Sequence, residues 1–176
     1  MRSVDQTSSL DNSGHSSVGE NARVRLSFFE KCRAYLQLTK PRIIVLFSLT
    51  GLPAMILEGS MLSPPLAMWM VCLGIALTGG SANAFNQFLD RDIDAVMERT
   101  KKKRPLPNGS LSSHSALVFA CVTGALATLV LYVYGGPLSA LLGVGTIFYY
   151  VVIYTMWLKR ATPYNIVIGG AAGASG

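Results

Sequence analysis

The apolar residues of this chain lie in long blocks. Four segments are almost free of charged residues, namely 43–57, 65–88, 116–134 and 138–158. Most of them approach or exceed the roughly 20 residues that an α-helix needs to cross a bilayer. A fifth apolar segment starts near Ile166 and reaches about half of that length by the last residue. The pattern predicts an all-α fold, a polytopic membrane helical bundle with four transmembrane helices and the start of a fifth.

The first 26 residues have a different composition. They are Ser-rich and polar, and they carry charges of both signs, with Asp5, Asp11 and Glu20 among them. Such a segment buries too little apolar surface to fold, so residues 1–26 are predicted to be a disordered tail before one membrane domain, 27–176. The tail lacks the apolar centre of a secretory signal, and its acids are unusual in a mitochondrial presequence. We therefore expect a bacterial inner membrane, with the mitochondrial inner membrane as the alternative.

Positive charge is confined to one side of the predicted bundle. Every Lys and Arg lies in the segment up to Arg42, in the loop 91–104 or in the pair Lys159 and Arg160. With four spans, these three places face the same side, which the positive-inside rule identifies as cytoplasmic. The net charge of +6 is thus a property of a membrane face, and no nucleic-acid motif accompanies it. Three widely separated cysteines predict neither a disulfide framework nor a zinc site.

One polar cluster stands at the end of the second apolar segment. Asn86, Asp90 and Asp94 follow one another at intervals of four residues, so they share one face of a helix if the helix continues that far, whereas Asp92 does not. Two carboxylates and an amide oxygen suit Mg²⁺, which prefers oxygen ligands and shares its coordination with substrate phosphates. A simpler alternative is a helix end whose acids pair with nearby Arg91 and other cations in water. Ionisable groups at a membrane boundary are usually functional, which favours the metal site.

Three motifs resemble a known family. The segment 86–94 continues into Arg99-Thr100, Arg104-Pro105-Leu106 and Asn108-Gly109; Leu38-Thr39-Lys40-Pro41-Arg42 precedes the first span; and residues 154–170 follow the fourth. In order and spacing they resemble the UbiA-type intramembrane prenyltransferases, and within them the haem O synthases, or protohaem IX farnesyltransferases. The pair Asn86-Gln87 is typical of this haem branch. The resemblance covers the chain from about Gln37 onward.

The resemblance carries expectations about fold and completeness. The family has about nine helices and a second Asp-rich motif in its C-terminal half, so this chain is expected to be an N-terminal fragment that holds half of a two-part site. Lys102 and Lys103 make its loop longer and more basic than the usual family pattern.

It also implies an activity, the Mg²⁺-dependent transfer of a farnesyl group from farnesyl diphosphate to a vinyl group of haem b, giving haem O for haem-copper oxidase assembly. Haem b is then a substrate and not a cofactor, and the lipid bilayer is the third partner. The implied catalytic and metal-binding residues are Asn86, Asp90 and Asp94. The implied diphosphate-binding residues are Lys40, Arg99, Lys103 and Arg104.

Two other functions compete with this interpretation. One is a prenyltransferase of the same superfamily acting on an aromatic quinone precursor, in which Asn-Asp often replaces the Asn86-Gln87 pair. The other is half of a cation-coupled membrane transporter, which predicts ionisable residues near mid-membrane and Gly or Pro breaks inside two spans. The acids of this chain instead cluster at one end of a span, beside cations that suit a phosphate.

Overall fold

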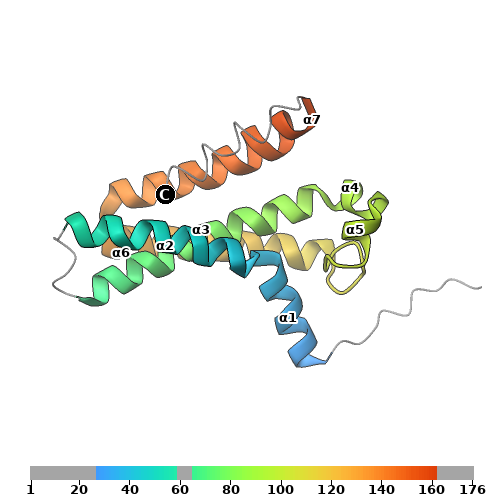
Figure 1. Cartoon of the computed structure of the whole chain (residues 1–176), viewed down its shortest axis with the longest axis horizontal. Coiled ribbons are helices and arrows are strands. Elements are labelled where there is room, and N and C mark those ends of the chain that lie inside the picture. The colour runs from blue at the N-terminus through green and yellow to red at the C-terminus, as the bar shows by residue number, and fades with distance from the viewer. Residues whose placement is uncertain (1–26, 59–64, 162–176) are drawn as a thin grey trace, which may run out of the picture.

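A computed structural model describes residues 27–58 and 65–161. All regular secondary structure in these ranges is helical, and residues 102–112 form a loop (Figure 1). The elements are α1 (Phe28–Thr39), α2 (Pro41–Glu58), α3 (Pro65–Leu89), α4 (Arg91–Val96), α5 (Glu98–Lys101), α6 (Ser113–Phe148), η2 (Tyr149–Leu158) and α7 (Lys159–Ala161). The all-α prediction is confirmed for this part of the chain. The predicted tail 1–26, the fifth apolar segment and the motif residues after 161 lie outside the described residues.

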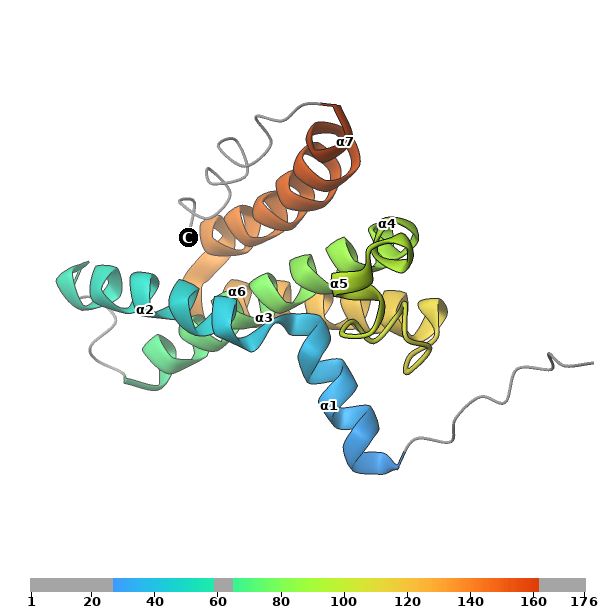
Figure 2. The same cartoon turned by 45° about the vertical axis from the view of Figure 1, so that its right-hand side comes forward.

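The long apolar segment Ser113–Leu158 folds back on itself. If straight, its 46 residues would extend about 70 Å, more than twice the thickness of a bilayer's hydrocarbon core. Gly136 interrupts the helical backbone with φ 82° and ψ 175°, a conformation that is open to glycine, and Pro137 follows it. The chain reverses there, so the part after Gly136 runs back beside the part before it (Figures 1 and 2). Gly143 accordingly lies against Leu131, twelve residues earlier.

The number of spans is only partly resolved by this geometry. In the described residues, two helical segments are long and apolar enough to cross a membrane, Pro65–Leu89 and Ser113–Leu158, and the first two helices together give a third candidate that is bent by 50°. Because Ser113–Leu158 doubles back, its two arms match the two spans expected from the sequence. The total of four stays a prediction.

Small residues bring α3 and α6 close together. Ser81 donates a hydrogen bond from its hydroxyl to the Ala120 carbonyl at 2.8 Å. A Cβ atom added at Gly124 would come within 2.8 Å of the same hydroxyl. Membrane helices associate through such close contacts, because lipid tails provide no hydrophobic driving force between them.

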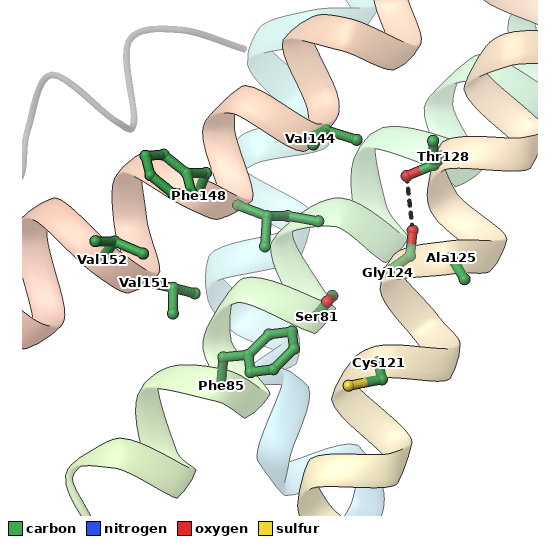
Figure 3. Close-up of a pocket in the computed structure, with 11 residues that line it drawn as sticks. Ser81, Phe85, Cys121, Gly124, Ala125, Thr128, Val144, Phe148, Val151 and Val152 are labelled. Carbon is green, nitrogen blue, oxygen red and sulfur yellow. Dashed lines mark hydrogen bonds between the residues drawn. The ribbon is translucent and has the colours of Figure 1, made fainter.

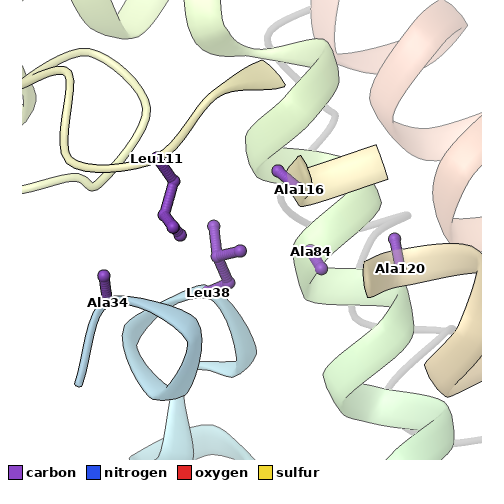
Figure 4. Packing of buried hydrophobic residues seen from close by; sticks show 6 residues of the cluster. All are labelled: Ala34, Leu38, Ala84, Leu111, Ala116 and Ala120. Carbon is purple, nitrogen blue, oxygen red and sulfur yellow. The ribbon is translucent and has the colours of Figure 1, made fainter. Parts of the chain in front are cut away.

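A cluster of buried apolar residues lies at the end of the bundle where α1 packs against α3 and α6. Alanines of three helices meet one leucine from α1 and one from the end of the basic loop (Figure 4). The six residues are Ala34, Leu38, Ala84, Leu111, Ala116 and Ala120. Their packing joins α1 and the loop to the α3–α6 pair, and it does so next to the Asp-rich segment.

Candidate active site

The Asp-rich segment keeps a helical course through the end of α3. Asp90 separates α3 from α4, yet its backbone N–H donates to the Asn86 carbonyl and the Asp94 N–H donates to the Asp90 carbonyl, both at 2.9 Å. The side chains of Asn86, Asp90 and Asp94 are all buried, with 3%, 0% and 3% exposure. Asp92 is exposed. The spacing of four therefore places the three residues on one side of the helix, as expected, and the structure shows that this side is buried.

Each buried carboxylate is paired with a cation from a distant part of the chain. Lys159, the first residue of α7 directly after η2, binds Oδ2 of Asp90. Arg104, in the loop before α6, binds Oδ2 of Asp94. Both pairs bridge different elements, so they fix the position of η2 and of the loop relative to α3 and α4.

The loop 102–112 folds back over the Asp-rich segment 86–94, which allows Arg104 to reach Asp94. The Thr100 side chain is buried and donates to the Asp94 carbonyl at 2.9 Å. Pro105 is fully buried, and its carbonyl accepts a hydrogen bond from the Leu111 N–H at 3.0 Å. These contacts position Arg104 between two anchored points of the loop.

Lys40 approaches the segment from α1, and amide side chains on α3 set its position. Gln87 Nε2 donates to the carbonyls of Gln37 and Leu38, at 3.1 and 3.0 Å, and Asn83 Nδ2 donates to the Thr39 carbonyl at 3.2 Å. These bonds satisfy carbonyls that the end of a helix leaves without partners. Lys40 then takes a left-handed conformation with φ 53°, which is uncommon for a residue other than glycine.

The Lys40 side chain ends beside Asn86. Its Nζ donates to Asn86 Oδ1 over 3.4 Å, a long hydrogen bond. Lys40 lies at the polar end of the bundle, between α1 and α2. Burial lowers the pKa of Lys40 from 10.5 to about 8, and the positive charges of Arg104 and Lys159 act in the same direction. An anion bound here would raise that pKa again, because it would favour the charged ammonium.

Asn86 is also held from the opposite side. Its Nδ2 donates to the hydroxyl of Thr155 at 3.1 Å, and that hydroxyl donates to the Tyr150 carbonyl at 2.7 Å. Thr155 lies in the wider π-helix η2, a helix type that is rare and frequent at functional sites. The contact leaves Asn86 Oδ1 turned toward the lysine and fixes the orientation of the amide.

The residues present suit a divalent cation. Asp90 Oδ1 is buried and accepts no hydrogen bond from the described part of the chain. A buried carboxylate oxygen in that state is costly unless a cation or donor completes it. In the same part of the chain, no three His, Cys, Asp or Glu side chains are grouped closely enough to bind a metal alone. A cation here would therefore take oxygen ligands from Asp90, Asp94, the Asn86 amide and a bound substrate. Such a set of oxygen ligands suits Mg²⁺.

The structure brings some of the predicted residues together and leaves others apart. Asn86, Asp90 and Asp94 share one buried region with Arg104 and Lys40. The predicted phosphate contacts Arg99 and Lys103 are exposed instead, and the described ion pairs of the two acids do not include them.

Three participants were not predicted from the sequence as parts of the site, Lys159, Thr155 and Gln87. Charge placement could have indicated Lys159, since its positive charge was expected on the same membrane face as the Asp-rich loop. Thr155 and Gln87 act through contacts with distant segments, which spacing along the chain does not show.

An apolar groove runs along the bundle beside the site (Figure 3). It has a volume of about 430 Å³, and α3 and both arms of the long helical hairpin line it. Ser81 and Phe85 come from α3, Gly124 from the first arm, and Val144 and Val151 from the second. Phe85 directly precedes Asn86 in α3, so this part of the groove lies at the same level of the bundle as the polar cluster.

Comparisons with known proteins agree on one family. The profile described as the UbiA prenyltransferase family matches residues 44–176. "Protoheme IX farnesyltransferase" of Symbiobacterium thermophilum is 51% identical over 156 residues, which are 88% of this chain and 51% of the relative. The protein of the same name from Clavibacter sepedonicus is 47% identical over 86% of this chain and 49% of its own length.

A third relative, "Protoheme IX farnesyltransferase 1" of Shewanella sp. (strain MR-4), is 44% identical over 90% of this chain and 51% of its own length. The chain thus spans about half the length of the curated relatives it matches. No solved structure matches it.

Proposed function

The chain belongs to the UbiA prenyltransferase family, and we propose that the complete protein transfers the farnesyl group of farnesyl diphosphate to a vinyl group of haem b. The product would be haem O, for the assembly of haem-copper oxidases. The observation that carries the proposal is the buried cluster at the end of α3. There Asp90, whose Oδ1 has no hydrogen-bond partner among the described residues, lies among cations from three separate parts of the chain.

The cluster separates metal ligands from phosphate ligands. We assign Asp90, Asp94 and Asn86 to Mg²⁺, which when bound would neutralise the charge that develops on the departing diphosphate. Lys40, Arg104 and Lys159 are close enough to this group to bind phosphate oxygens, and the planar guanidinium of Arg104 suits two of them at once. Arg99 and Lys103 remain predicted phosphate contacts that would require the loop to move.

The reaction that this arrangement favours is a substitution at an allylic carbon. The carbon–oxygen bond of farnesyl diphosphate breaks, and its electron pair leaves with the diphosphate. The vinyl group of haem b supplies the electron pair for the new carbon–carbon bond, and a water molecule then adds to the resulting cation and loses a proton. Fixed positive charges around the leaving group lower the barrier to the first step, because they favour the charge as it develops.

The apolar groove suits the farnesyl chain. Its lining is almost wholly apolar, and its volume lies within the range of about 300–1,000 Å³ that is usual for small-molecule pockets. A chain in the groove would have its diphosphate near Phe85, next to the polar cluster. The two halves of the substrate would thus meet surfaces of matching polarity.

The haem acceptor is favoured over an aromatic quinone precursor by the names of the relatives, which are protoheme IX farnesyltransferases at 44–51% identity. The transporter alternative gains no support, since the family is one of prenyltransferases and the acids lie at one end of the helices. We further propose four spans, a bacterial inner membrane location and a cytoplasmic Asp-rich loop.

Membranes that contain the complete protein test the proposal. They would be incubated with farnesyl diphosphate, Mg²⁺ and either haem b or a hydroxybenzoate, and the products analysed by mass spectrometry. We expect farnesylated, hydrated haem, dependent on Mg²⁺ and on Asp90. A prenylated hydroxybenzoate without any haem product would overturn the acceptor assignment, and no transfer to either acceptor would overturn the function.

A further inference from the structure

The two buried acids share an arrangement that their predicted roles do not require. In each, Oδ2 is bound by a cation of the chain itself, Lys159 on Asp90 and Arg104 on Asp94. Both carboxylates are buried, and the other oxygen of Asp90 has no partner among the described residues. A metal ion at the open oxygen of Asp90 would lie beside the ammonium on the other oxygen, so it meets positive charge already in place.

The net charge of the cluster disfavours a metal ion that binds without an anion. Two carboxylates stand with Lys40, Arg104 and Lys159, which gives the cluster one net positive charge. A divalent cation arriving alone would add to this excess in a partly buried place, where like charges repel strongly. A diphosphate carries more negative charge than one such ion carries positive, so the two together would relieve the excess.

The side chains are suited to change partners without a change in the helices. Lys159 has a flexible four-carbon stem and three donors, and Arg104 presents a planar fork that matches phosphate geometry. Both are only partly buried, with side-chain exposures of 31% and 24%, although the acids they bind are almost fully buried. The cations can thus turn toward a neighbouring anion more easily than the acids can move.

We propose that Lys159 and Arg104 are exchangeable counter-ions that make the divalent cation and the diphosphate bind together. Each holds one oxygen of a carboxylate that the metal would share, and each transfers to a phosphate oxygen when the diphosphate arrives with the metal. This inference rests on the proposed function, because it assumes that a metal and a diphosphate share the cluster. Its consequence is that metal alone binds weakly, and that removing either cation changes the two affinities in opposite directions.

The test measures binding, not turnover. Mn²⁺ serves as the probe for the metal, followed by electron paramagnetic resonance, and the Mn²⁺ complex of inorganic pyrophosphate serves as the probe for the anion, followed by equilibrium dialysis. The complete protein in detergent is compared with Lys159→Gln and Arg104→Gln. Arg91→Gln is the matched control, because Arg91 pairs with the exposed Asp92 at 3.5 Å, outside the cluster.

We expect Lys159→Gln to bind Mn²⁺ alone at least about fivefold more tightly and the pyrophosphate complex at least about fivefold less tightly, the lower end of usual coupling strengths. Arg104→Gln should shift both affinities in the same two directions, and Arg91→Gln should shift neither. Opposite shifts distinguish exchange from a structural role, which would weaken both. If Lys159→Gln loses its helical circular dichroism, Arg104→Gln decides the matter.

Two failures can be told apart. Should the unmodified protein bind no Mn²⁺–pyrophosphate complex, the proposed function itself is wrong, and this inference falls with it. Should it bind the complex while both variants weaken Mn²⁺ binding or leave it unchanged, the site stands and only the exchange of counter-ions is refuted.

Discussion

The C-terminal end of α3 and its middle are both buried, yet different forces hold them. At the end, Asn86, Asp90 and Gln87 make directional contacts to Lys40, α1, η2 and Lys159. In the middle, Gly74 and Ser81 bury almost no side-chain volume and let α6 approach closely. The structure at the end of α3 therefore depends on specific polar atoms, whereas the packing in its middle depends on small side chains.

We interpret the polar end of α3 as functional and its small-residue middle as a packing contact. A buried polar cluster in which one carboxylate oxygen has no partner within residues 27–58 and 65–161 is maintained at a cost to stability. The small-residue contact needs no such explanation, since it is what membrane helices use to associate. Changes at the end should therefore alter catalysis first, and changes in the middle should alter stability first.

The largest effect is expected from Asp90→Asn. The amide keeps the shape of the side chain but removes the charge that would hold a metal, so kcat/KM for farnesyl diphosphate should fall about 10³-fold. Asp92→Asn, two residues away and exposed, should change it less than about fivefold. Equal losses in both variants would contradict the division between buried and exposed acids.

Arg104→Gln should come next. It removes the cation that binds Asp94 and that is placed for a phosphate oxygen, so we expect kcat/KM to fall about 10²-fold. The neighbouring variant Lys103→Gln serves as the control, because the Lys103 side chain is exposed. A loss at Lys103 as large as that at Arg104 would show that the loop rearranges to bring in the residue that the sequence favoured.

Gly124→Ala tests the middle of the helix pair. The added methyl group would meet the Ser81 hydroxyl at 2.8 Å, and this hydroxyl is held by its bond to Ala120. Such overpacking usually costs about 1–3 kcal/mol of unfolding free energy. Thermal unfolding in detergent should show the loss.

The control for this change is Gly145→Ala, where the new atom meets nothing within 4 Å. Its helical site should gain about 0.5–1 kcal/mol from the replacement of glycine. A stability loss at Gly145 equal to that at Gly124 would refute the close-contact explanation.

The smallest effect is expected from Thr155→Val, which removes the acceptor of Asn86 Nδ2 and leaves the shape intact. An unsatisfied buried donor costs about 1–3 kcal/mol, so farnesyl transfer should slow about tenfold. Thr78→Val is matched to it, since Thr78 is equally buried but donates only to Gly74 of its own helix. Transfer rates of the two variants that agree within twofold would mean that Thr155 does not orient Asn86.

The sequence predicted what depends on spacing along one helix. The interval of four residues correctly placed Asn86, Asp90 and Asp94 on one helix face, and the blocks of apolar residues predicted an all-helical bundle. The break between the third and fourth apolar segments also corresponds to a real reversal, at Gly136. These features depend on residues close together in the chain, so periodicity and composition can predict them.

Contacts between distant segments could not be predicted in the same way. Lys103 and Arg104 are adjacent and both positively charged, and only the fold of the loop, anchored by Thr100 and Pro105, decides which of them reaches an acid. Thr155 and Lys159 join the cluster because η2 returns alongside α3. No pattern within their own segment indicates that partner.

An experimental structure of the complete protein with Mg²⁺ and farnesyl thiodiphosphate, an analogue that resists cleavage, would test the central claim most directly. We predict a metal ion bound by side-chain oxygens of Asp90 and Asp94, a diphosphate in contact with Lys159 and Arg104, and a farnesyl chain in the groove that Phe85 lines. A diphosphate bound at Arg99 and Lys103, with both buried ion pairs intact, would contradict the account.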